Sequence, residues 1–358
     1  MESTDATPGG ATFRTTKAPA RSPGRVAEID ALRGVAAMSV VLFHYTTRFN
    51  ELFQPGTGID WQFRHGHYGV NLFFIISGFV IFMTLQRTSR PMDFVVSRFS
   101  RLFPAYWAAI ALTFAITHLL GLPQKLVTLR EAFANMIMLH GLFRIPHVDG
   151  VYWTLEVELL FYAGMFLLYL SGRLHQIERF LIALLGLRIA YALLERYAGI
   201  SLPWTIYRLL ILQYLPWFGI GIALYMRVHP TGDADRKKSN LILLASVATL
   251  FVAESLVLGT LSCVLGACVY LAATGQLSIL RHPLLVWLGT ISYPLYLLHE
   301  NIGWSIELRA LDVGLPFAVA ASGALLLTLA MSHLLSRTVE QPAMRWIRGQ
   351  WRRRKLAA

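Results

Sequence analysis

The chain has 358 residues, of which 55% are hydrophobic and 15% are charged. Soluble domains average about 45–50% apolar and 25% charged residues, so this composition excludes an ordinary soluble protein and indicates a polytopic membrane protein. The net charge of +12 is spread over connecting segments, which argues against nucleic acid as a partner.

Apolar windows of about 20 residues, the length that crosses a bilayer, predict an all-α integral membrane protein with about ten transmembrane helices. We divide the chain into a disordered basic tail (1–26), a membrane domain (27–340) and a basic C-terminal tail (341–358). The boundary between the seventh and eighth windows, around Gly259, is the least distinct. The windows lie near residues 27–47, 67–86, 103–121, 152–171, 177–195, 205–226, 241–258, 260–279, 284–303 and 314–336.

Basic residues set the expected orientation. With a cytoplasmic N-terminus, 22 of the 32 Lys and Arg residues fall on the cytoplasmic side and 8 on the outer side. Cytoplasmic loops are enriched in Lys and Arg, so this distribution favours an even number of spans and two cytoplasmic termini. The expected location is the inner (plasma) membrane, crossed several times.

Arg33 and His44 lie in the first window, EIDALRGVAAMSVVLFHY. Eleven residues make three helical turns plus roughly 20°, so the two side chains share a face about 16 Å apart along the axis. An Arg at the centre of a bilayer costs at least about 2.5 kcal/mol, which makes such residues functional candidates. In the alternative interpretation, Arg33 snorkels to the interface and His44 only bridges two helices.

The second window contains Ser77-Gly78 among large apolar residues. Small residues let two helix backbones approach closely, so the pair predicts either a packing notch or a gap for a slender ligand arm. The loop that follows leads to Arg98 and Arg101, three residues apart at the start of the next helix, where Pro104 fits the first turn. Two guanidiniums on one helical face suit phosphate binding, although topology alone also attracts arginine to this loop.

Glu156 and Glu158 begin the fourth window, in VYWTLEVELLFY. Residues two apart on a helix differ by about 200°, so only one of them faces the bundle interior. Such a carboxylate either orients an imidazole or pairs with Arg48 or Arg144. In the preceding loop, residues 122–151, which can cover the outward mouth of a cavity, we expect His140 and His147 to be solvated.

The ninth window, GTISYPLYLLHE, places His299 at a depth similar to that of His44. Two histidines from different spans at one depth indicate a shared site. Cys263 and Cys268 face different sides of one helix, and no HExxH or Gly-rich phosphate loop is present, so we expect neither cysteine chemistry nor a metal.

Taken together, six segments resemble the integral membrane acyltransferase 3 family, which acylates sugars of bacterial polysaccharides, lipopolysaccharide, Nod factors and some macrolides. The segments are EIDALRGVAAMSVVLFH, GVNLFFIISGFV, SRFSRLFPAYW, YWTLEVELLFY, GTISYPLYLLH and VEQPAMRW. Asn71 and Thr154 depart from the family pattern, in which Asp and Ser are frequent. Glu156 is an extra carboxylate found in some members only.

The resemblance implies a role for each matching residue. Arg33 and His44 match the Arg-x10-His motif, Arg98 and Arg101 match the cytoplasmic RxxR motif, Glu158 matches the carboxylate of a WSLxxE-like motif, and His299 closes SYPLYLLH. We therefore expect His44, Glu158 and His299 to be catalytic, and Arg33, Arg98 and Arg101 to bind acyl-CoA.

The function implied is O-acyl transfer, with acetyl the expected group, from cytoplasmic acyl-CoA to a hydroxyl of a sugar or glycan at or beyond the membrane. His44 would act as general base or carry the acyl group transiently. The expected partners are the lipid bilayer and a glycan, glycolipid or glycosylated acceptor, and a separate periplasmic or extracellular acyl-transfer protein stays open. A multi-span transporter or flippase is the main alternative, and a purely structural membrane protein is the third.

Overall fold

The computed structural model describes residues 27–53 and 61–357, and this part of the chain contains helices and no strand. The predicted all-α class is therefore confirmed, whereas the predicted tail 1–26 lies outside the described residues. The main helices are α1 (Ala27–Phe43), α2 (Phe49–Phe53), α3 (Gly69–Gln86), α4 (Pro91–Leu120), α5 (Leu129–Asn135), α6 (Trp153–Leu170), α7 (Ile177–Ala198), α8 (Trp204–Leu209), α9 (Leu215–Val228), α10 (Asp233–Ala253), α11 (Leu256–Ala273), α12 (Pro283–Leu298), α13 (Glu300–Asp312), α14 (Phe317–Leu335) and α15 (Gln341–Ala357).

Within the described residues, five helical segments are long and apolar enough to cross a membrane, and α9 and α12 are shorter apolar helices. The five segments are Arg64–Gln86, Pro91–Leu120, Gly150–Leu170, Leu256–Ala273 and Phe317–Lys355. All ten predicted windows fall on helices, but residues 205–226 are divided into α8 and α9, and residues 284–303 pass from α12 into α13 at His299. The break between the seventh and eighth windows lies at Glu254 and Ser255, between α10 and α11, rather than around Gly259. The count of ten spans and the orientation of the termini stay predictions.

Pro104 does not lie in a first turn, so that prediction was wrong. The helix begins at Pro91, and Pro104 lies in its interior. Arg90, just before Pro91, has an extended backbone, as a residue that precedes proline prefers. Arg98 and Arg101 consequently lie about two turns inside α4, which holds both side chains on a rigid element.

Close glycine contacts hold the centre of the bundle together. A Cβ at Gly34 of α1 would lie 2.6 Å from the backbone nitrogen of Gly289 in α12. Between α3 and α9, a Cβ at Gly78 would lie 2.2 Å from the carbonyl oxygen of Phe218. Small residues at such crossings let backbones touch, so Gly78 serves as a packing notch, one of the two interpretations of the Ser77-Gly78 pair.

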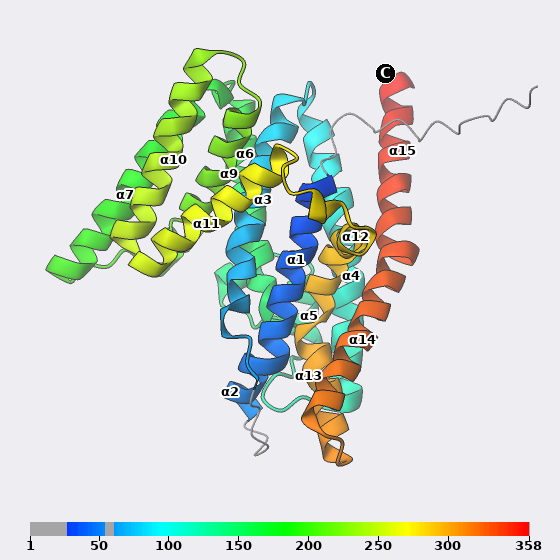
Figure 1. The fold of residues 1–358 in the computed structure, drawn as a ribbon. Helices are drawn as coiled ribbons and strands as arrows, with labels where there is room; N and C mark the ends of the chain where they lie inside the picture. Colours follow the sequence, from blue (N-terminus) through cyan, green and yellow to red (C-terminus); the bar gives the residue numbers. More distant parts are fainter. Residues whose placement is uncertain (1–26, 54–60, 358) are drawn as a thin grey trace, which may run out of the picture.

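Figure 1 separates the molecule into a central bundle and a lateral group formed by α7, α10 and α11. In the central bundle, α1 runs from the upper part of the view down to α2, and α12 runs the same way into α13. Residues 341–357, expected as a tail, form α15, which is anchored on α4. There Asp93 accepts a hydrogen bond from Trp351 Nε1 at 2.7 Å and pairs with Lys355 Nζ at 2.9 Å.

Two π-helical segments interrupt the described helices, at His44–Arg48 and at Ser336–Glu340. π-helical segments are rare overall, but those that occur are frequently found at functional sites. The first begins with His44, and the second ends with Glu340, which lies beside Arg101. Each segment therefore carries an ionisable side chain at one of its ends, His44 in the first and Glu340 in the second.

Candidate active site

His44 and His299 meet at the end of α1, as their similar depth predicts. The two rings lie edge to face with centroids 4.9 Å apart, and His299 Nε2 lies 3.2 Å from His44 Nδ1. His299 is fully buried, whereas 13% of the His44 side chain is exposed. Only His44 can therefore touch a ligand that arrives from outside without a rearrangement.

Backbone carbonyls determine where the protons lie on both rings. His44 Nδ1 lies 2.9 Å from the oxygen of Val40, and His299 Nδ1 lies 3.0 Å from the oxygen of Tyr296. A carbonyl only accepts, so each neutral ring carries its hydrogen on Nδ1. The one Nδ1–H of His44 is then shared between the Val40 oxygen and, at the longer distance, His299 Nε2, and His44 Nε2 keeps a free lone pair. This arrangement makes His44 Nε2 the basic atom of the pair.

A carboxylate that the sequence analysis did not single out faces this basic atom. Glu300 Oε2 lies 3.4 Å from His44 Nε2, and the Glu300 side chain is 7% exposed. Asp149 holds the same turn in place, because its Oδ2 accepts a hydrogen bond of 3.0 Å from the Asn301 backbone N–H. We call His44, His299 and Glu300 the histidine end of the site. Glu300 could have been suspected because it directly follows His299.

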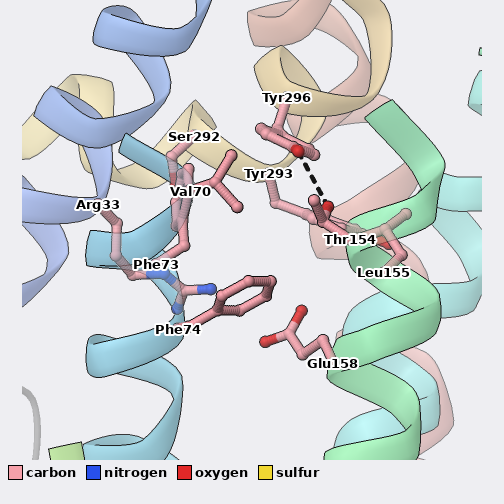
Figure 2. A pocket seen from close by; sticks show the side chains of 10 residues that line it. All are labelled: Arg33, Val70, Phe73, Phe74, Thr154, Leu155, Glu158, Ser292, Tyr293 and Tyr296. Carbon is pink, nitrogen blue, oxygen red and sulfur yellow. Dashed lines mark hydrogen bonds between the residues drawn. The ribbon is translucent and has the colours of Figure 1, made fainter. Parts of the chain in front are cut away.

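Glu158 lies away from the histidines and faces Arg33 across a small cavity (Figure 2). Its Oε1 accepts hydrogen bonds from Ser77 Oγ at 2.7 Å and from the Tyr162 hydroxyl. The structure thus brings His44 and His299 together and places Glu158 with Arg33. The imidazole in this site has a carboxylate beside it, but that carboxylate belongs to Glu300.

Two cavities meet at Arg33 and Glu158. The first, of about 40 Å³, is lined mainly by α3, α6 and α12 and reaches Tyr296, whose ring centroid lies 5.6 Å from that of His299. The second, of about 20 Å³, extends in the other direction to Arg98 and Arg101. The two adjoining cavities therefore form a path from Arg98 and Arg101 past Arg33 and Glu158 to Tyr296, which stands between the path and the histidine end.

Three guanidiniums gather at the other end of this path. Arg98 and Arg101 line the second cavity, and Arg348 of α15 donates hydrogen bonds to Ser100 Oγ at 3.0 Å and to the Ser97 oxygen at 3.2 Å. We call Arg98, Arg101 and Arg348 the arginine end. The sequence analysis missed Arg348 because it treated α15 as a tail, although VEQPAMRW was among the recognised segments.

The arginine end has more positive than negative charge. Glu340 Oε1 lies 3.9 Å from Arg101, a long distance for an ion pair, and Arg98 Nε is buried without a hydrogen-bond partner in the part of the chain that the structure describes. A buried donor without a partner costs about 1–3 kcal/mol. An anion with several oxygens, such as a phosphate, neutralises the excess positive charge and accepts a hydrogen bond from Arg98 Nε. This end therefore fits a phosphate-bearing ligand.

Glu156 faces away from the path and forms a separate buried cluster. It pairs with Arg208 at 2.5 Å rather than with Arg48 or Arg144. His140 Nε2 and His147 Nδ1 lie 2.6 Å apart beside it. Burial lowers the pKa of His140 to about 3 and that of His147 to about 4, so both rings are neutral. The expectation that both histidines are solvated was wrong for His140, which is fully buried, whereas His147 is partly exposed.

Ionisable side chains that line cavities inside an apolar helical bundle are typical of a membrane protein that handles a polar substrate. The acyltransferase domain family matches residues 26–337, and the chain belongs to that family. The resemblance stated from the six sequence segments is thereby confirmed, and the protein is an acyltransferase that transfers groups other than aminoacyl groups. Membership in this family favours the enzyme over the transporter and over the purely structural alternative.

Relatives support the same class. The chain is 29% identical over 330 residues to the exopolysaccharide production protein ExoZ of Rhizobium meliloti (strain 1021), which covers 84% of this chain and 96% of that protein. It is 27% identical over 239 residues to the putative membrane-bound transacylase BcsY of Komagataeibacter xylinus, covering 62% and 56% of the two chains. No solved structure matches the chain.

Proposed function

We propose that the protein transfers an acyl group, acetyl in the simplest case, from cytoplasmic acyl-CoA to a hydroxyl of a glycan at the outer side of the inner membrane. The observation that carries the proposal is the pair of adjoining cavities that leads from the arginine end to Tyr296, whose ring lies beside His299 at the histidine end. The phosphates of the acyl donor require fixed positive charge, which the arginine end supplies. The acceptor hydroxyl requires a base, which the histidine end supplies. The relative ExoZ, named for exopolysaccharide production, supports a glycan as the acceptor.

In this proposal, Arg98 and Arg101 hold the phosphates of acyl-CoA, and the unpartnered Arg98 Nε gains a hydrogen bond. The pantetheine arm follows the two cavities past Arg33. Cavities of about 40 and 20 Å³ hold one or a few water molecules, so the arm passes only when the surrounding helices separate slightly. The Tyr296 ring is the side chain that must turn aside before the thioester reaches His44.

At the histidine end, His44 Nε2 takes the proton of the acceptor hydroxyl. The hydroxyl oxygen forms a bond to the thioester carbonyl carbon, the carbon–sulfur bond breaks, and the CoA thiolate takes the proton from Nε2. His299 accepts from His44 Nδ1 and keeps the ring in the form that leaves Nε2 free. General base catalysis of this kind contributes about 10²–10⁴-fold to a rate.

The test measures acyl transfer to a glycan acceptor in membranes that contain the His44→Ala variant. We expect kcat to fall by about 10³-fold, because Ala provides no base. His118→Ala is the matched control, since His118 is an exposed histidine that hydrogen-bonds its own helix. If the His44→Ala variant is present in the membrane at the wild-type amount and transfers acyl groups at a near-normal rate, His44 is not the catalytic base. Glycan movement without consumption of acyl-CoA would restore the transporter alternative.

A further inference from the structure

Glu300 is a buried carboxyl group that the proposed mechanism has not yet used. Its Oε2 lies 3.4 Å from His44 Nε2, beyond the usual range of a strong hydrogen bond but well within ion-pair distance. The Nε2 lone pair is therefore still available to an acceptor hydroxyl. The carboxylate lies beside the atom that becomes N–H when the proton is transferred.

The surroundings fix the position of Glu300. A Cβ at Gly150 would lie 2.2 Å from Glu300 Oε1, so the loop leaves room for this carboxylate only because residue 150 has no side chain. The next residue, Asn301, is held by Asp149 through its backbone N–H and by the Val148 oxygen, which accepts from Asn301 Nδ2 at 2.9 Å. The loop before α6 and the start of α13 thus clamp Glu300 against His44.

Several ionisable side chains surround Glu300 and His44. The positive charges of Lys125 and Arg48 interact with both Glu300 and His44, and the negative charge of Asp149 interacts with Glu300. His299 contacts His44 on its Nδ1 side. On the Nε2 side of His44, the charged group in contact is the Glu300 carboxyl.

We propose that Glu300 is the positioning residue of His44, and that its carboxylate stabilises the imidazolium formed when Nε2 takes the proton of the acceptor hydroxyl. The inference rests on the proposed function and adds one element to it. Opposite charges a few ångströms apart in a poorly solvated site attract strongly, so the ion pair lowers the energy of the step in which His44 is charged. When Nε2 passes its proton to the CoA thiolate, His44 is neutral again and the cycle closes.

The experiment compares Glu300→Gln with Glu307→Gln in the same acyl-transfer assay. Glu307 is a matched control, because it is a buried glutamate two turns later on α13 whose carboxylate oxygens have no hydrogen-bond partner. For Glu300→Gln we expect kcat to fall by about 10²-fold with an unchanged KM for acyl-CoA. The rising limb of the kcat–pH profile should move to lower pH, because a base without a neighbouring anion loses its proton more readily. Glu307→Gln should leave kcat and the pH profile unchanged.

Two further variants separate this role from a structural one. Glu300→Asp keeps the charge and should recover part of the activity that Glu300→Gln loses. Gly150→Ala keeps Glu300 but displaces its carboxylate, and kcat should fall by about 10-fold at normal membrane levels; it decides the question if Glu300→Gln fails to fold.

The outcomes distinguish this inference from the proposed function. Loss of activity in His44→Ala with wild-type kcat and pH profile in Glu300→Gln would overturn the role of Glu300 and leave the proposed function standing. Wild-type kcat in Gly150→Ala would overturn it in the same way. Activity in His44→Ala would overturn both.

Discussion

The histidine end and the arginine end differ in how their polar atoms are satisfied. At the histidine end, each Nδ1 has a backbone carbonyl partner, and His299 Nε2 accepts from His44. At the arginine end, Glu340 lies 3.9 Å from Arg101 alone, and Arg98 Nε has no partner among the described residues. The first end is complete without a ligand, and the second end is not.

This difference indicates what each end contributes. A hydrogen-bonded, buried pair is preorganised and changes little when substrate arrives, which suits a chemical step. A group of unneutralised guanidiniums gains most when an anion binds. Damage to the histidine end should therefore lower kcat, and damage to the arginine end should raise the KM for acyl-CoA.

After His44→Ala, the largest effect is expected from His299→Phe, which keeps a ring of similar size but removes the second acceptor for His44 Nδ1, the one beside the Val40 oxygen. We predict that kcat falls by about 10²-fold while the KM for acyl-CoA changes by less than about twofold, because His44 loses its fixed orientation. Steady-state kinetics in purified membranes measure both constants. His333→Phe, in α14, is the control. An unchanged kcat would contradict the proposed use of His299.

At the arginine end, the double variant Arg98→Ala/Arg101→Ala should raise the KM for acyl-CoA by about 30-fold with little change in kcat. The reason is that charge-assisted hydrogen bonds to phosphate are lost. Direct binding of a radiolabelled acyl-CoA provides the measurement. Arg87→Ala/Arg90→Ala removes two exposed arginines just before and at the start of α4 and serves as the control. Equal affinity for acyl-CoA in both double variants would show that Arg98 and Arg101 contribute only to membrane topology.

A smaller effect of the same kind is expected from Arg348→Ala. We predict a rise of about fivefold in the KM for acyl-CoA, since Arg348 contributes charge but is itself tied to Ser97 and Ser100. The rise should shrink at high salt, because added ions screen exposed charge. Arg345→Ala, one turn earlier on α15, is the comparison variant. If the two variants behave alike, Arg348 does not belong to the arginine end.

The smallest effect has the opposite sign. Glu340→Gln removes the carboxylate that lies 3.9 Å from Arg101 but retains an acceptor for the Ser336 hydroxyl. Arg101 is then free to bind phosphate more strongly, so we predict that the KM for acyl-CoA falls by about twofold. Isothermal titration with CoA alone measures the same change without turnover. A weaker interaction with CoA would show that Glu340 orients Arg101 rather than competes for it.

Sequence reasoning located the helices well, because windows of about 20 apolar residues are strong signals for membrane helices. It could not locate the breaks, since the turn between α8 and α9 and the change of helix at His299 depend on tertiary contacts. The error at Pro104 has a similar origin. Pro91 supplies an earlier helix start, and hydrophobicity alone does not reveal it.

For the site, helical geometry was sufficient to place Arg33 and His44 on one face, and comparable depth was sufficient to pair His44 with His299. Neither kind of reasoning could predict the side chains that contact these residues from distant parts of the chain. Glu300 reaches His44 only because Gly150 leaves space for its carboxylate. Arg348 reaches the arginine end only because Trp351 and Lys355 anchor α15 to Asp93. Contacts between segments more than 100 residues apart leave no periodic trace in one sequence.

The π-helical turn at His44–Arg48 has a consequence for how this protein can change over time. Such a turn is an α-helix with one residue too many, so the helix before it and the helix after it are out of phase by about 100°. The carbonyl oxygen of His44 accepts hydrogen bonds from the Phe49 backbone N–H and from Trp304 Nε1 at 3.0 Å. Deletion of a single residue from this turn would realign the helix and rotate His44 away from His299 or Tyr45 away from the core. A change in the length of this stretch would therefore displace the site even if every side chain were kept.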